Sequence, residues 1–219
     1  MRKFIVISMI LSCMLFTAGC KENNIYIEKI SDLRQDIYTG GADDLTLTAN
    51  YGFKESPFIA DGKVSDIVYG YTFKLHIIPD EIKRSIEFSD ENKEYSAVFE
   101  LDDLTREYKA FIEIQKHFDK QFTAHIISGT DVKEVVLTSI VPENCIDYKK
   151  ALEIVTEKQK PLFDAYTIDG KFNAEIYMRI FVKDLKPYWY IAITPSENKL
   201  KAMLIDGFNG EPLAVKDIF

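Results

Sequence analysis

The stretch Ile67-Val68-Tyr69-Gly70-Tyr71-Thr72-Phe73-Lys74-Leu75-His76-Ile77 carries an apolar side chain at every odd position. The even positions after residue 68 hold glycine or polar residues. Successive side chains of a β-strand point to opposite faces, so this alternation predicts a strand with one buried and one polar face. It is the clearest strand signal in the chain.

The same period of two recurs on both sides of this stretch. Apolar and polar side chains alternate over 45–51, 95–101, 110–114 and 122–126, and a mixed pattern follows over 135–141. Turn-forming residues, such as Asp61-Gly62 and Gly129, separate these segments. Six or seven short strands over 44–141 predict an antiparallel β-sandwich. In architecture it resembles an immunoglobulin-like domain, without the Cys-Trp-Cys core of true immunoglobulin domains, and we expect it to occupy residues 25–141.

A short helix is expected at the start of this domain. Ser31 is a favourable N-cap, Leu33 and Ile37 share one face of a helix, and Gly40-Gly41 end the pattern.

The pattern changes again at Pro142. Asp147 is a favourable N-cap, and Pro161 ends the apolar stripe of Tyr148, Ala151, Leu152 and Val155. Three strands are predicted next, over 175–183, 188–194 and 201–206, before a turn at Asn209-Gly210. A helix and a three-stranded antiparallel meander make a small α+β unit over 142–219. The expected fold class is mainly β with this α+β unit.

The closing run reads Tyr188-Trp189-Tyr190-Ile191-Ala192-Ile193, then Met203-Leu204-Ile205-Asp206-Gly207 and Asn209-Gly210-Glu211-Pro212-Leu213. It is similar to a PepSY domain, a family with a Trp-containing strand, a strand ending in Asp, and a Gly-Glu turn into a final aliphatic step. PepSY-like modules occur in peptidase propeptides and envelope lipoproteins, where they are thought to restrain peptidases. The resemblance implies restraint or inhibition of an extracellular peptidase as one function.

The first twenty residues predict where the protein is located in the cell. Arg2-Lys3 precede an apolar segment over 4–16, and Thr17-Ala18-Gly19-Cys20 follows. This arrangement is a secretory signal, too short to span a bilayer. The small-residue run ending in cysteine resembles the lipobox of bacterial lipoproteins. The resemblance implies a signal peptide over 1–19, lipidation of Cys20, a tether over 20–24, and a location on the extracytoplasmic face of the cell membrane.

The net charge limits the classes of partner, and the cysteine content limits the possible disulfides. Removing residues 1–19 leaves 200 residues with 35 acidic and 25 basic side chains, a net charge of −10. Nucleic acid is excluded, because phosphates need a basic footprint. With Cys13 removed and Cys20 lipidated, Cys145 alone remains, so no intrachain disulfide is expected.

Motifs that carry chemistry are missing from the sequence. It has no Gly-x-Ser-x-Gly elbow, phosphate-binding glycine loop or His-Glu-x-x-His pair. Cys145, two residues before the cap Asp147, is interpreted as a buried linker thiol. A hydrolase remains a third class, supported only by Cys145 and the acidic turns Asp43-Asp44 and Asp102-Asp103. We expect no catalytic residue and no cofactor.

The histidines are interpreted as exposed sheet residues. The apolar pattern predicts a hairpin in which Phe118 opposes Phe122, which places His117 and His125 on the solvent face as diagonal neighbours. Glu113 is the one obvious additional ligand, so no metal site is expected.

One sheet face in the C-terminal unit is unusually aromatic. Tyr177, Phe181, Tyr188 and Tyr190 share the face opposite the one that a helix can cover. Either the sandwich packs on these rings, or they form a platform for a peptide or glycan.

These observations predict a lipid-anchored, extracytoplasmic binding or regulatory module without catalytic activity. Its partners are the membrane, through the lipid, and an envelope peptidase, a peptide or wall glycan. The alternative function is PepSY-type restraint of a peptidase.

Overall fold

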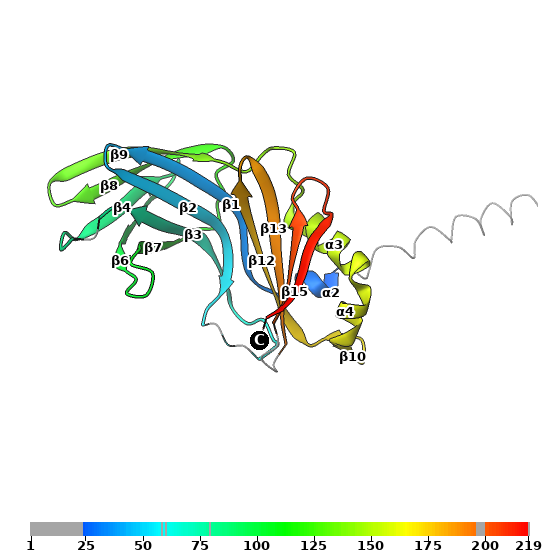
Figure 1. The fold of residues 1–219 in the computed structure, drawn as a ribbon. Coiled ribbons are helices and arrows are strands. Elements are labelled where there is room, and N and C mark those ends of the chain that lie inside the picture. Colours follow the sequence, from blue (N-terminus) through cyan, green and yellow to red (C-terminus); the bar gives the residue numbers. More distant parts are fainter. Residues whose placement is uncertain (1–23, 58, 60, 79, 196–199, 219) are drawn as a thin grey trace, which may run out of the picture.

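The protein is mainly β and its sheet is almost entirely antiparallel (Figure 1). The structure is a computed structural model that describes residues 24–57, 59, 61–78, 80–195 and 200–218. Cys20 and the tether up to residue 23 lie outside the described residues.

The strands of the first half are β1 (Ile30–Ala42), β2 (Leu45–Glu55), β3 (Ile67–His76), β4 (Arg84–Ser89), β5 (Glu94–Val98), β6 (Glu100–Leu101), β7 (Tyr108–Glu113), β8 (Gln121–Ser128) and β9 (Asp131–Ser139). The remaining elements are α2 (Asn24–Ile27), α3 (Tyr148–Lys158), α4 (Lys160–Ala165), β10 (Thr167–Ile168), β11 (Lys171–Phe172), β12 (Ala174–Lys183), β13 (Lys186–Pro195), β14 (Leu200–Asp206) and β15 (Pro212–Ile218).

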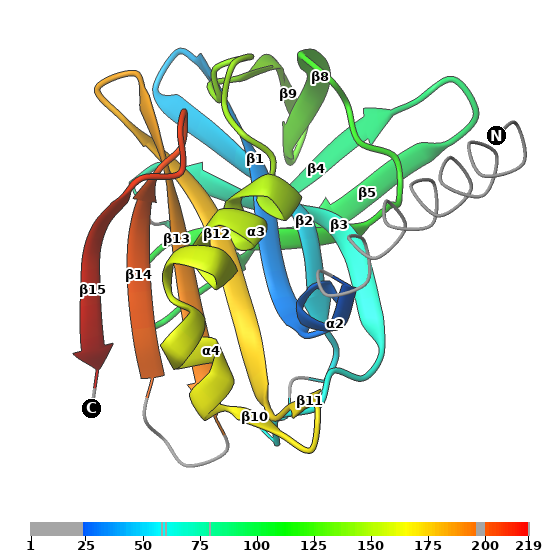
Figure 2. The same cartoon turned by 90° about the vertical axis from the view of Figure 1, so that its right-hand side faces the viewer.

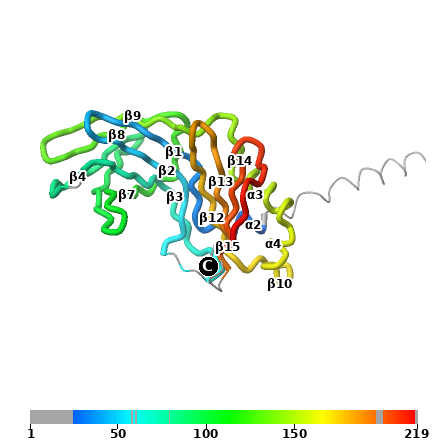
Figure 3. The backbone as a smooth tube through the Cα atoms, in the orientation of Figure 1, coloured from blue at the N-terminus to red at the C-terminus, as the bar shows by residue number. Residues whose placement is uncertain are grey.

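Strand β1 joins the two halves of the chain. It pairs with β2 in antiparallel orientation along its length, with β9 near its end, and with β12 in parallel orientation near its start. All strands except β10 and β11 therefore belong to one 13-stranded sheet. The tube in Figure 3 shows β1 curving from one half into the other.

The curve depends on places where the backbone has no room for side chains. Strand β1 has a register shift between Arg34 and Asp36, and Gly52 and Gly70 lie opposite each other on β2 and β3 beside it. A Cβ on Gly52 would lie 1.8 Å from the carbonyl oxygen of Leu33, and one on Gly70 would lie 2.2 Å from that of Ile112. Bulges and strand glycines permit sharp bends and close backbone approach, so these positions locate the bend.

Two hydrophobic cores lie on the same face of the bent sheet. The first core fills the space enclosed by β1–β4 and β7–β9 and includes Tyr38, Leu47, Tyr51, Tyr71, Phe73, Phe88, Phe122 and Leu137. The second core lies under α3 and α4 and includes Leu33, Leu152, Val155, Phe163, Ile176, Met178, Trp189 and Met203. Figure 2 shows both helices in front of β12 and β13. The sequence predicted that the odd positions of β3 form a buried face. Residues 71, 73 and 75 are indeed buried in the first core.

The helix predicted after Pro142 is confirmed. Asp147 Oδ1 accepts a hydrogen bond from the backbone N–H of Lys150 at 2.7 Å, and Ala151, Leu152 and Val155 are buried. The predicted C-terminal strands are also present, but the meander has a fourth strand, β15, which pairs with β14.

The helix predicted from Ser31 is wrong, because residues 30–42 form β1. The i, i+4 spacing of Leu33 and Ile37 is typical of a helix. In β1 the register shift between Arg34 and Asp36 instead puts these two side chains on different faces of the sheet, so Leu33 is buried in the second core and the partly buried Ile37 lines the groove described below. Tertiary pairing on both sides of the strand overrides the local pattern. Among the described residues, no helix is long and apolar enough to cross a membrane.

Candidate binding face

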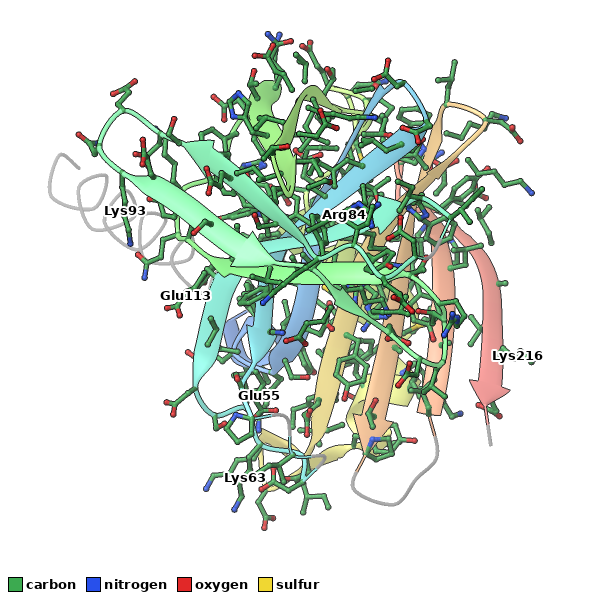
Figure 4. All side chains as sticks on the ribbon, turned by 90° about the vertical axis from the view of Figure 1, so that its left-hand side faces the viewer. Glu55, Lys63, Arg84, Lys93, Glu113 and Lys216 are labelled. Atoms are coloured by element: carbon green, nitrogen blue, oxygen red, sulfur yellow. The ribbon has the colours of Figure 1, made fainter. Side chains whose placement is uncertain are left out.

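The four predicted aromatic residues lie on one surface. We call it the concave face: the face of β13, β12, β1, β2 and β3 that is opposite the two cores. Tyr177 and Phe181 project from β12, while Tyr188 and Tyr190 project from β13. The rings of Phe181 and Tyr188 stack at 5.5 Å between centroids. Figure 4 looks toward this face with the helices behind the sheet.

A groove hollows the middle of the concave face. Its volume is about 380 Å³, and residues of five strands line it. Phe181, which is 37% exposed, and Tyr190 form part of its wall together with Ile37 and Ile180. The polar lining consists of Arg34, Thr48, Asn50, Lys74, His76 and Arg179. The bend of β1–β3 brings these two sets of residues together, because the strands curve toward the viewer's left in Figure 1 and leave this face inside the curve.

Two arginines share one carboxylate in this groove. Arg34 and Arg179 are register partners on β1 and β12. Asp32 Oδ2 accepts a hydrogen bond from an Arg179 NH2 group at 2.8 Å, whereas Asp32 Oδ1 lies 3.8 Å from Nε of Arg34. Burial and the adjacent Arg179 charge lower the pKa of Arg34, an effect that Asp32 opposes. The pair therefore carries more positive charge than its carboxylate neutralises.

The other rim of the groove is polar and partly neutralised. Lys74 Nζ donates to Glu107 Oε2 at 2.9 Å, and this contact lowers the pKa of Glu107. His76 Nε2 lies 3.3 Å from Thr48 Oγ1. Three cationic side chains thus face two carboxylates in a chain whose overall charge is −8.

Two buried carboxyl groups lie near one end of the sheet. Glu175, fully buried on β12, accepts a hydrogen bond from the backbone N–H of Gly62 at 3.1 Å. Glu55 accepts one from Ser65 at 2.8 Å and lies near Lys63 at the lower end of the sheet in Figure 4. The Oε2 atoms of both are buried without a hydrogen-bond partner in the described part of the chain. Burial, followed by the neighbouring charges of Glu55 and Asp61, raises the pKa of Glu175.

The predicted histidine hairpin is wrong. Strand β8 pairs with β4 and β9, and β7 pairs with β3 and β6, so His117 and His125 are not cross-strand neighbours in one hairpin. His117 is half-buried; its Nε2 lies 3.1 Å from Asp36 Oδ2 and 2.8 Å from the hydroxyl of Tyr38, and its ring stacks on Tyr51. Within the described residues, no group of three His, Cys, Asp or Glu side chains is placed to hold a metal ion.

Cys145 and His117 line the same pocket, of about 240 Å³, although no motif connects these two residues. The Cys145 thiol is half-buried and donates to the carbonyl of Ile146 at 3.4 Å. Burial raises its pKa to about 11, so it is protonated at neutral pH. Trp189 Nε1 donates to the same carbonyl at 2.9 Å, which ties the thiol's neighbourhood to the second core.

Sequence reasoning missed the charged half of the concave face. The alternation of the sequence places Arg179 on the same strand face as Tyr177 and Phe181. It also places Lys74 and His76 on the polar face of the strand over 67–77. For Arg34 the signal was hidden, because the segment was assigned to a helix.

Comparisons with known proteins give no further guide to the site. No family model, no curated protein and no solved structure matches this chain.

Proposed function

We propose that this protein is a lipid-anchored, extracytoplasmic binding module without catalytic activity, and that it takes its ligand on the concave face. The groove between Phe181 and the arginine pair is the observation that carries the proposal. Small-molecule sites are clefts with apolar walls and a few convergent polar groups. This groove has that composition, and residues far apart in the sequence build it.

The lipid anchor is the second part of the proposal. It rests on the lipobox-like Thr17-Ala18-Gly19-Cys20, and the acidic body would need the lipid because anionic headgroups repel it. The anchor would hold the binding face close to the membrane surface.

A capture experiment tests the binding face. The lipidated protein is used to capture ligands from its own membranes and wall material, and it is compared with a Phe181→Ala, Tyr190→Ala variant. Leu213→Ala with Val215→Ala is the matched control, because each of these β15 side chains is 50% exposed outside the groove. We expect the groove variant to lose the captured ligand and the control to keep it. Equal capture by a folded groove variant would contradict the proposal.

A second candidate is restraint of an extracellular peptidase through a PepSY-like unit over 142–219, next to an immunoglobulin-like sandwich over 25–141. The helix α3 packed on the antiparallel strands β12–β14, which β15 extends, supports this finer description. Specific co-purification of an envelope peptidase, with loss of its activity on addition of the protein, is the expected result for this candidate. Capture of wall glycan alone would favour the first.

A further inference from the structure

The geometry of the groove points to the class of its ligand: we propose that the concave face binds a small organic anion, with its carboxylate or phosphate group between Arg34 and Arg179 and its apolar part against Phe181 and Tyr190. This inference rests on the proposed function and adds the chemistry of the ligand.

The arrangement of the two arginines is the first support. They are adjacent across the parallel pairing of β1 and β12, and like charges in a partly buried place repel each other strongly. Asp32 contacts Arg179 closely but reaches Arg34 only at 3.8 Å. A second oxyanion would therefore balance the positive charge that Asp32 leaves on the two arginines. The planar guanidinium fork matches the paired oxygens of carboxylate and phosphate.

Unused hydrogen-bond donors are the second support. Nε of Arg179 is buried and has no partner within the described residues. Over the same residues, the side chain of Arg34 donates no hydrogen bond, and the carboxylate nearest to it, that of Asp32, lies 3.8 Å from its Nε. Each guanidinium offers five N–H donors, and a buried donor without a partner is unfavourable. The side chains of Arg34 and Arg179 are 34% and 41% exposed, so an oxyanion bound between them would accept from their solvent-facing N–H groups.

The dimensions and walls of the groove are the third support. Its volume of about 380 Å³ lies at the lower end of the range for small-molecule sites. The apolar wall suits an aromatic or aliphatic group next to the anion, while Asn50 and Thr48 supply neutral polar contacts. Lys74 and His76 place further basic groups on the opposite rim, which favours an anion over a cation.

The test compares four probes of similar size on the mature lipidated protein in detergent: phenyl phosphate, benzoate, benzyl alcohol and benzylamine. Isothermal titration and ligand-observed NMR measure affinity. We expect one or both anions to bind at least about tenfold more tightly than the neutral alcohol and the amine, since a charge-assisted hydrogen bond contributes that much. Phenyl phosphate and benzoate together show which oxyanion the groove prefers. If benzyl alcohol binds as tightly as the anions, the inference is overturned, while an aromatic platform, and with it the proposed function, stands.

Variants locate the anion. Arg34→Gln with Arg179→Gln should weaken anion binding at least about tenfold. Lys93→Gln with Lys216→Gln removes the same charge from exposed sites outside the groove (Figure 4) and should leave the affinity unchanged. Unchanged affinity in the folded arginine variant would overturn the inference.

A third variant gives an effect of the opposite sign. Asp32→Asn removes the carboxylate that competes for both arginines, so anion affinity should rise several-fold. It also keeps the inference testable if the arginine variant fails to fold. Two results would overturn the anion assignment and leave the binding function intact. One is weaker anion binding by a folded Asp32→Asn protein. The other is a wild type that binds none of the probes but still captures its natural ligand.

Discussion

At the scale of single residues, the carboxyl group of Glu175 is in an environment that disfavours its ionised form. It is completely inaccessible to solvent, one of its oxygens has no partner in the described part of the chain, and the Glu55 charge lies nearby. A raised pKa in the native state means that the folded protein binds a proton which the unfolded chain releases. Stability from this group is therefore full below the ordinary glutamate pKa and is lost as the pH rises through the native value.

Glu175→Gln should remove this pH dependence. The amide keeps an oxygen for the Gly62 N–H and carries no charge, so the variant should gain about 1 kcal/mol over wild type at pH 7.5 and little or nothing at pH 4. Urea unfolding at both pH values measures the difference, and Glu113→Gln, exposed on β7, is the control. A variant that is equally less stable at both pH values would show that the carboxylate is needed for its hydrogen bonds.

Cys145 should behave as an unreactive thiol. A pKa of about 11 leaves more than about a hundredfold less thiolate at pH 7.5 than an ordinary cysteine has. Iodoacetamide should therefore label the native protein slowly and the protein unfolded in guanidinium chloride at the normal rate. Cys145→Ser should keep ligand capture. Rapid native labelling, together with loss of function in a folded Cys145→Ser protein, would mean that the pocket shared with His117 holds a nucleophile.

Residue types alone indicated half of the candidate site. The aromatic members were found because period-two alternation fixes which strand residues share a face, and Tyr177, Phe181, Tyr188 and Tyr190 do share one. The arginine pair was not found, because it depends on a parallel pairing between residues almost 150 positions apart, which no local pattern encodes.

At the scale of elements, β1 shows why local patterns failed at one place. Its 13 residues are longer than a typical strand and contain two glycines and a register shift, so the apolar positions lose strict alternation. Strands with regular alternation, such as β3 and β13, were predicted to within a few residues. The capped helix α3 was predicted equally well, because its signals are local.

The bend in β2 makes a sharp steric prediction. Gly52→Ala should destabilise the protein by about 3 kcal/mol or more, because the added Cβ would overlap the Leu33 carbonyl of the neighbouring strand. Thr46→Ala, exposed on the same strand, should change stability by about 0.5 kcal/mol or less. Urea midpoints of the two variants give the comparison. Equal midpoints would show that the bend does not depend on the missing side chain.

At the scale of the whole molecule, one sheet face carries both hydrophobic cores and the other face carries the groove. The cores under the helices and within the curled strands both draw on the same side of β1 and β2, although Tyr69 on that side of β3 is 39% exposed. The polar side carries neither core, and the bend at Gly52 and Gly70 gives it curvature. Composition predicted a sizeable core but not its division, since the division follows from β1 pairing with β12.

The lipid anchor is the prediction that concerns the molecule in its surroundings. Wild-type protein labelled with a fatty-acid probe should carry the label and sediment with membranes, whereas Cys20→Ala should be unlabelled, because Cys20 is the expected acceptor thiol. Cys13→Ala, a cysteine expected to leave with the signal, is the matched control and should be labelled like wild type. Two acyl chains give stable membrane attachment where one gives marginal binding, so retention of the labelled protein should withstand high salt. Equal labelling of wild type and Cys20→Ala, or none in either, would remove the anchor and leave the concave face as a binding site without a fixed location.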